Sequence, residues 1–148
     1  MTLDEIHSAW EKDSPITDNK LDEVSAQCPM LHAKYLSWYT AAKMALKRRQ
    51  MQYDVLEKEK WLWFNGKLTK PEMDAKGWPY DPFNGMTKPL KGEMEMWYRT
   101  DPDMSKLLGV IEYQKILVDT IEEILKNITW RHSTIRNCID WKRFQAGN

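Results

Sequence analysis

The segment 58–67 alternates cations with aromatic rings, and its residue types point most directly to a binding chemistry. These residues are Lys58, Lys60, Trp61, Trp63, Phe64 and Lys67. Single-stranded nucleic acid is held by cations that follow the phosphates and by rings on which bases stack, at about 1–3 kcal/mol per stacked base. The segment offers both, and it predicts a DNA contact through Lys58, Lys60, Trp61 and Lys67. Two of the three rings could instead fill the core, and Glu57 and Glu59 dilute the local positive charge.

A second group of cations lies in a stretch, residues 31–50, that contains no acidic residue. Its members nearest the aromatic segment are Lys43, Lys47, Arg48 and Arg49. Lys43 and Lys47 are one helical turn apart, whereas Arg48 points about 100° away, so the cluster wraps around a helix. Such a run is usually a solvated face. In an oligomer, however, repetition of a modest patch raises the affinity through effective concentration.

Catalysis has little support in this sequence. His7, His32 and His132 are far apart and form no ligand-spaced pair, and no glycine-rich phosphate loop or nucleophile elbow is present. Neighbouring acids such as Glu122 and Glu123 are typical of solvated helix faces. The sequence therefore predicts a protein that is not an enzyme and needs no metal or cofactor.

The net charge of zero is the sum of segments of opposite charge. Residues 1–30 hold seven acids against two lysines, and the last 22 residues hold four cations against one acid. Because a phosphate-binding surface is local, a neutral total does not exclude a nucleic-acid partner. The 148 residues predict one domain, and Cys28 and Cys138 lack the spacing of a zinc or redox motif. We expect a cytoplasmic protein, since neither a membrane-spanning run nor a signal pattern is visible.

Helix signals dominate the first 66 residues. A capping box at Thr2 starts a helix that ends before Pro15, and Thr17 or Asp18 can cap a second short one. Pro29 is expected to break or kink that second helix and to begin a long one, which runs to about residue 64. Gly66 suits the left-handed conformation that ends it.

The centre of the chain changes character, because five of the seven prolines lie between residues 71 and 102. A short helix over 71–76 is predicted, and the rest of 67–101 is expected to be an ordered loop or short extended segments whose aromatics pack against other residues. Asp101 or Asp103 then caps a long C-terminal helix. The expected architecture is all-α, with parts 1–66, 67–101 and 102–148.

An apolar stripe with four-three spacing runs along this C-terminal helix. Its apolar members are Leu107, Ile111, Val118, Ile121, Leu125, Ile128, Ile135 and Ile139. A second apolar row widens the surface beyond what a helix on a small monomer needs. The stripe therefore predicts self-association through the C-terminal region.

Two sets of features, one at each end of the chain, occur in a recognisable order. The N-terminal set is Leu3 with Asp4-Glu5, Ile16-Thr17-Asp18 before Lys20-Leu21, Met30-Leu31 with Lys34 and Leu36, and Lys58 and Lys60 before an aromatic-Asn-Gly turn; the C-terminal set is Arg131, Ile135, Ile139, Asp140, Arg143 and Phe144-Gln145-Ala146-Gly147. In these features the chain resembles the UvsY-type recombination, repair and single-strand-binding proteins of T-even-like phages and cyanophages. The two sets cover roughly residues 1–66 and 104–148, and the match fades in the centre.

The resemblance implies an all-helical protomer of a ring, usually of six or seven subunits, that assembles through its C-terminal region. It also implies single-stranded DNA binding, displacement of the phage single-strand-binding protein and loading of a UvsX-like recombinase of the RecA family, in the cytoplasm of an infected bacterium. The family's two basic DNA-binding positions fall on Lys58 and Lys60. In the family, the neighbours of these two basic positions are neutral or apolar, whereas this chain has Glu57, Glu59 and Trp61 there. We therefore expect the other cations to supply a larger share of the DNA binding. The alternative is a helical adaptor that binds only proteins.

Overall fold

Helix α1 (Leu3–Asp13) begins at the predicted capping box: the Thr2 hydroxyl accepts from the Glu5 amide, and the Glu5 carboxylate accepts from the Thr2 amide. The computed structural model describes residues 1–147. Helix α1 ends before Pro15, as predicted, because the residue before a proline is disfavoured in the helical conformation.

Helix α2 (Leu21–Phe64) is longer than predicted, because it continues through Pro29 without a break. The expected short helix and long helix are therefore one element. Pro29 leaves the Ser25 carbonyl without its helical donor. Leu21 and Val24, in the turns before Pro29, are half-buried. Packing of an apolar face commonly outweighs local propensity.

The end of α2 is the predicted glycine cap. Gly66 has a φ of 67°, its amide donates to the Trp63 carbonyl at 3.1 Å, and the Lys67 amide donates to Leu62 at 2.8 Å. These two bonds form a Schellman motif, in which the left-handed residue satisfies carbonyls at the helix end.

The central segment holds more helix than predicted. Helix α3 (Lys70–Lys76) matches the expected short helix, with Thr69 and Glu72 as its capping box. A 3-10 turn, η1 (Lys91–Glu93), then leads into α4 (Met94–Thr100), where only a loop was expected. The sequence prediction gave too much weight to the flanking prolines and glycines. The uninterrupted run of 94–100 is long enough for two turns of helix.

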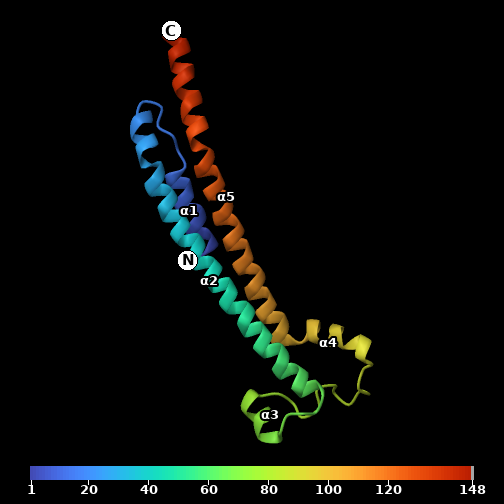
Figure 1. The fold of residues 1–148 in the computed structure, drawn as a ribbon. Coiled ribbons are helices and arrows are strands. Elements are labelled where there is room, and N and C mark those ends of the chain that lie inside the picture. Colours follow the sequence, from blue (N-terminus) through green and yellow to red (C-terminus); the bar gives the residue numbers. More distant parts are fainter. Residues whose placement is uncertain (148) are drawn as a thin grey trace. The chain divides into compact units, whose positions relative to one another are not determined.

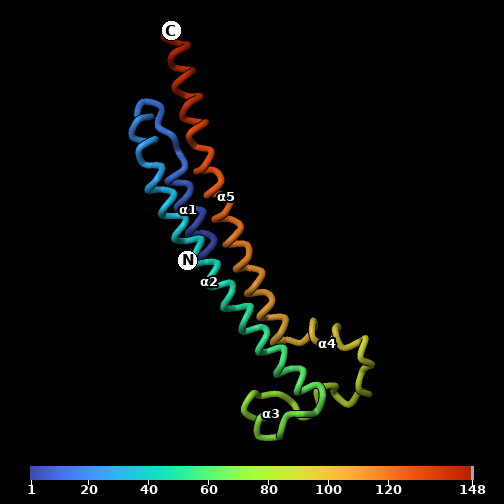
Figure 2. Tube along the Cα trace, viewed as in Figure 1, coloured from blue at the N-terminus to red at the C-terminus, as the bar shows by residue number. Residues whose placement is uncertain are grey.

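Helix α5 (Pro102–Gln145) is the predicted C-terminal helix (Figures 1 and 2). Of the two candidate caps, Asp101 is the one used, since its carboxylate accepts from the Met104 amide at 3.1 Å. The described residues thus form an all-α chain.

The chain divides into two compact units. The first contains Met1–Ala45 and Tyr113–Asn148, and the second contains Leu46–Glu112, so that α2 and α5 contribute to both. These boundaries differ from the sequence divisions near residues 66 and 101.

In the first unit, α1 and the N-terminal part of α2 lie alongside α5, which runs antiparallel to α2 (Figure 1). The Gln114 amide donates to the Ala42 carbonyl at 3.1 Å, and the Leu3 amide donates to the Tyr113 hydroxyl at 3.1 Å. The core of this unit is formed by Ile6, Tyr35, Ala42, Leu117, Val118, Ile121, Ile124, Ile128 and Ile135.

The second unit has an aromatic core. Trp63, Phe64, Met73 and Phe83 are buried together, with Leu68, Trp78, Met94, Trp97 and Tyr98 packed against them. Four of the five aromatic residues of the central segment are therefore packed, as predicted, whereas Tyr80 is 54% exposed. The packed rings hold the irregular backbone of this segment against the end of α2.

Candidate nucleic-acid interface

The exposed face of α2 in the second unit carries part of the predicted DNA-binding set. Lys47, Lys58 and Trp61 are all exposed, and intervals of four and three residues through positions 47, 51, 54, 58 and 61 place them on one face. Lys47 and Lys58 are about 16 Å apart along the helix axis at 1.5 Å per residue. Asp54 shares this face, so the positive charge along it is interrupted.

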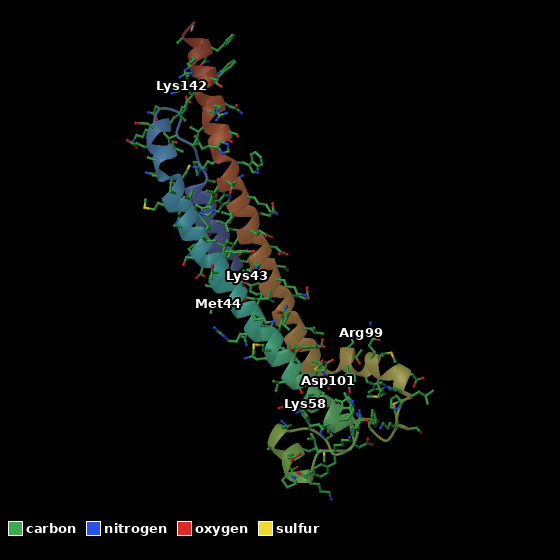
Figure 3. The ribbon with its side chains drawn as sticks, in the orientation of Figure 1. Lys43, Met44, Lys58, Arg99, Asp101 and Lys142 are labelled. Atoms are coloured by element: carbon green, nitrogen blue, oxygen red, sulfur yellow. The ribbon has the colours of Figure 1, made fainter. Side chains whose placement is uncertain are left out.

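The arginines next to Lys47 are exposed as well. Arg48 points away from the Lys47 face by its place in the helix, and the Arg49 guanidinium donates to the Gln52 side chain at 3.1 Å. Lys43 belongs to the first unit, where its ammonium lies 5.2 Å from the centre of the Tyr39 ring. Figure 3 marks Lys43 and Lys58 on α2.

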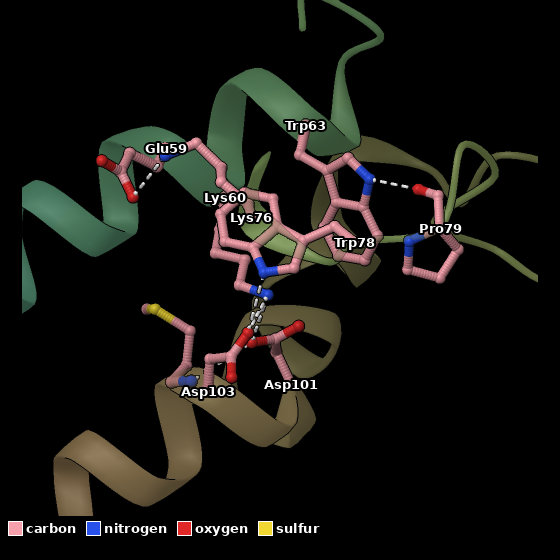
Figure 4. A network of polar contacts seen from close by, with 9 residues as sticks. Glu59, Lys60, Trp63, Lys76, Trp78, Pro79, Asp101 and Asp103 are labelled. Carbon is pink, nitrogen blue, oxygen red and sulfur yellow. Dashed lines mark hydrogen bonds and ion pairs between the residues drawn. The ribbon is translucent and has the colours of Figure 1, made fainter. Parts of the chain in front are cut away.

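The structure corrects the prediction for Lys60, whose side chain is 2% exposed. Its ammonium lies 3.1 Å from the Asp101 carboxylate and 2.8 Å from that of Asp103 (Figure 4). The rings of Trp63 and Trp78 lie under the same ammonium, with centres at 4.6 and 3.9 Å. Two carboxylates and two ring faces enclose this cation, so Lys60 has a structural role and does not face a phosphate.

Spacing alone could not separate Lys60 from Lys58, because the partners of Lys60 are more than forty residues away in the sequence. The Trp78 indole N–H also donates to Asp103, at 3.1 Å. The hydrogen bond and charge of Lys60, with a smaller contribution from Trp78, lower the pKa of Asp103 against the opposing effect of its partial burial. The network joins α2, the loop after α3 and the start of α5.

Of the three rings of the aromatic segment, two are buried in the core and one is exposed, which is the alternative that the sequence analysis left open. Trp63 and Phe64 are buried at 7% and 4% exposure, and the Trp63 indole N–H donates to the Pro79 carbonyl at 2.8 Å. Trp61 is 43% exposed, and the Lys67 ammonium lies 4.6 Å from the centre of its ring. An exposed indole beside an exposed lysine is the pairing that binding of unstacked bases requires.

The apolar stripe of α5 is covered mainly within the chain itself. Five of its eight members are buried, namely Ile111, Val118, Ile121, Ile128 and Ile135. Leu107 and Leu125 are half-buried, and Ile139 is 37% exposed. The five buried residues belong to the core of the protomer and offer no surface to a partner. Only the other three could contact a second subunit.

Large apolar side chains that the stripe did not include are exposed on α5. Trp130, Trp141 and Phe144 are 67%, 60% and 71% exposed, and the rings of Trp141 and Phe144 stack with centres 5.5 Å apart. The intervals 130, 134, 137, 141 and 144 put them on one face of the helix. Trp130 belongs to the second apolar row of the sequence prediction, which is Val110, Leu117, Ile124 and Trp130, whereas Trp141 and Phe144 were not predicted. The face through positions 130, 134, 137, 141 and 144, with polar members at 134 and 137, was the signal that could have identified them.

Among residues 1–147, no cluster of three potential ligands could hold a metal ion. Within the same range, no helix combines the length and apolar character that a bilayer crossing demands.

The sequence of this chain matches a known protein family. The family model described as "Recombination, repair and ssDNA binding protein UvsY" matches residues 9–148. The recombination protein uvsY of Enterobacteria phage T4 is 26% identical over 147 residues, which cover 99% of both chains.

Solved structures of the recombination mediator protein UvsY from bacteriophage T4 have the same fold. One crystal form superposes with a TM-score of 0.83 at 25% identity, covering 99% of this chain and 98% of the other. A second crystal form gives a TM-score of 0.81 at 24% identity, covering 95% and 98%.

Proposed function

Because the chain belongs to the UvsY family of recombination, repair and single-stranded-DNA-binding proteins, we propose that it is a recombination mediator that binds single-stranded DNA as a ring-shaped homo-oligomer. In this role it displaces the phage single-strand-binding protein and promotes the loading of a UvsX-like, RecA-family recombinase. A hexamer or heptamer is the assembly that the family resemblance implies.

The observation that carries the DNA-binding part is the exposed face of α2 in the second unit. Lys47, Lys58 and Trp61 share it, Arg48 and Arg49 widen it, and Lys67 adds a cation beside the indole. We define these six residues as the α2 surface. Lys43, which is exposed in the first unit, remains a separate predicted contact. Lys60 is excluded because its charge is already neutralised by two carboxylates.

Acids on and around the α2 surface, such as Asp54 and Glu57, keep its charge modest in a single chain. Repetition around a ring compensates for this, because a strand held by one subunit meets the next at a high effective concentration. Assembly and DNA affinity are thus coupled in the proposal. For assembly we propose the exposed end of α5, with Ile139, Trp141 and Phe144 as the contact residues, since the larger part of the predicted stripe is occupied within the protomer.

The salt dependence of oligo-dT binding tests the DNA role. Each phosphate contact on a single strand contributes about 0.7 to the slope of log affinity against log salt. A variant with Lys47, Arg48, Arg49 and Lys58 all changed to alanine should lose up to about 2.8 from that slope per subunit. Fluorescence anisotropy at several salt concentrations measures it.

The matched control changes four exposed lysines elsewhere to alanine, namely Lys12, Lys20, Lys106 and Lys126, so that the loss of charge is the same. An equal slope in the two variants would place DNA on another surface. Absence of any oligo-dT binding at low salt by the wild-type protein, with oligomers still formed, would favour the helical adaptor that binds only proteins.

A further inference from the structure

A groove of about 910 Å³ lies in the second unit, between the last turns of α2 and the segment 88–99. Its α2 wall is made by Tyr53, Glu57, Trp61 and Asn65, which follow one another at intervals of four residues. Lys88, Pro89, Leu90, Lys91, Met94, Glu95, Tyr98 and Arg99 form the opposite wall, and Leu108 completes the lining. The volume lies within the roughly 300–1,000 Å³ typical of small-molecule sites.

Aromatic rings line the α2 side of this groove. On this side Trp61 is 43% exposed and Tyr53 is half-buried, and Tyr98 on the opposite wall is half-buried as well. Burial raises the pKa of both tyrosines, with a further contribution from the carboxylate of Glu57, so both hydroxyls are neutral donors near pH 7. Flat rings and neutral hydrogen-bond donors suit a planar, polar-edged group such as a nucleobase.

Cations stand on the opposite wall. Lys88, Lys91 and Arg99 are all exposed, and they come from the central segment, in which the resemblance described in the sequence analysis fades. The Lys88 ammonium donates to the Asn65 side-chain carbonyl at 3.1 Å, and the Asn65 amide in turn donates to the Trp61 carbonyl at 2.8 Å. This chain of bonds fixes a cation close to the end of α2 that carries the exposed indole.

Two acids within the groove decide which part of a ligand goes where. Glu57 and Glu95 line it together with the rings, so a phosphate or an acidic peptide placed inside would be repelled. The N–H groups on the edges of nucleobases, by contrast, can donate hydrogen bonds to a carboxylate. The lining therefore matches a base inside and phosphates at the rim.

The walls of the groove are held in place by the core. Phe64 contacts Tyr98 edge-on at 5.2 Å, and Phe83 contacts Trp97 edge-on at 5.2 Å, so α4 is packed against the end of α2. The Lys60 network lies at the start of α5, which follows α4 directly. A site formed before its ligand arrives requires less ordering on binding.

We propose that this groove takes an unpaired base of single-stranded DNA against Trp61, with flanking phosphates on Lys88 and Lys91. The segment 88–99 thus forms the second wall of the DNA site, opposite α2. This inference rests on the proposed DNA-binding function, and it adds an enclosing groove and the cations Lys88 and Lys91 to a surface on which Trp61 already presents a ring.

Binding to oligo-dT and to an abasic oligonucleotide of the same length separates bases from phosphates. The wild-type protein should bind oligo-dT about tenfold more tightly, because the abasic strand offers nothing to stack. Trp61→Ala should bring the two affinities together, and Trp61→Phe should restore most of the difference. Lys88→Ala with Lys91→Ala should lower the salt slope by about 1.4, whereas the control Lys12→Ala with Lys126→Ala should leave it unchanged.

The outcomes are distinguishable. No binding of either strand by the wild-type protein would contradict the proposed function itself. Equal affinity for oligo-dT and the abasic strand, or a Trp61→Ala variant that still prefers oligo-dT, would overturn the base site while leaving a phosphate-binding mediator intact. An unchanged salt slope in the Lys88/Lys91 variant would overturn the role of the segment 88–99. Binding of a poly-glutamate peptide that is lost in that variant, with DNA binding intact, would assign the groove to a protein partner and overturn the proposal.

Discussion

The Lys60 ammonium lies 2.8 Å from the carboxylate of Asp103, a residue 43 positions further along the chain. Asp101, whose side chain is 4% exposed, forms an ion pair with the same ammonium at 3.1 Å and also caps α5. Lysine at this position therefore holds the start of α5 against α2, and it does so in a largely desolvated site. Lys58, two residues earlier, is exposed on the α2 surface.

Lys60→Met is expected to destabilise the protein by about 3 kcal/mol, because removing one partner leaves a buried carboxylate uncompensated. Lys58→Met, the matched control on the exposed face, should change the free energy of unfolding by less than about 0.5 kcal/mol. Urea unfolding followed by circular dichroism measures both. Equal stability of the two variants would show that the buried pair is not needed.

For DNA binding we expect the reverse of the effect on stability: Lys58→Met should weaken it, and Lys60→Met should not. Under conditions in which Lys60→Met remains folded, its salt slope for oligo-dT should equal that of the wild type, since its ammonium neutralises no phosphate. Lys58→Met should lower the slope by about 0.7 per subunit. A slope lowered by Lys60→Met would mean that the network opens when DNA binds.

Acid stability should report the same network through Asp103. Its pKa is lowered in the folded protein, chiefly by the Lys60 hydrogen bond, so it contributes stability above its unfolded pKa of about 3.9. That contribution is lost as the pH falls through the folded pKa. Asp103→Asn should therefore unfold with a shallower dependence on pH below about 4 than the wild type. Parallel pH curves for the two proteins would contradict this prediction.

The helices could be predicted from the sequence where a local signal defines them. Thr2 with Glu5, Thr69 with Glu72, and Gly66 each act within a few residues, and each is used as predicted. The break that Pro29 could introduce is absent, since α2 continues through this residue. The rest of the fold depends on contacts distant in sequence.

The candidate site divides in the same way. The exposure of Lys58 and Trp61 and the burial of Lys60 depend on where α4 and the start of α5 pack, and no spacing rule contains that information. Likewise, a heptad stripe marks an apolar face without saying whether α2 or a second copy covers it. Ile121 and Trp141 are both apolar residues on α5, yet one is fully buried and the other is 60% exposed.

A buried arginine holds the chain reversal after α1. The Arg131 guanidinium donates to the carbonyls of Asp13, Ser14 and Pro15 at 3.4, 2.9 and 3.2 Å. Arg131→Leu leaves these carbonyls without their donor, at a cost of about 2 kcal/mol.

The loss of stability in Arg131→Leu should be confined to the region around the chain reversal after α1. Hydrogen exchange in residues 3–20 is expected to accelerate in Arg131→Leu, while exchange in α3 and α4 stays unchanged. Arg136→Leu changes an exposed arginine on the same helix and is the control. Exchange accelerated equally throughout the chain would show global destabilisation and contradict a local anchoring role.

Assembly through the end of α5 can be tested without disturbing the core. Trp141→Glu with Phe144→Glu places charges on side chains that are 60% and 71% exposed, so the protomer should stay folded by circular dichroism. Its mass by light scattering should fall from that of the oligomer to that of smaller species, since an unpaired charge in an apolar contact costs several kcal/mol. Oligo-dT affinity should fall with it, because neighbouring subunits no longer present the α2 surface to the same strand. Met30→Glu with Leu36→Glu adds the same two charges at exposed side chains of the first unit, away from the α2 surface, and is the control for added charge. An oligomer of unchanged mass in the double variant would move the interface away from Trp141 and Phe144.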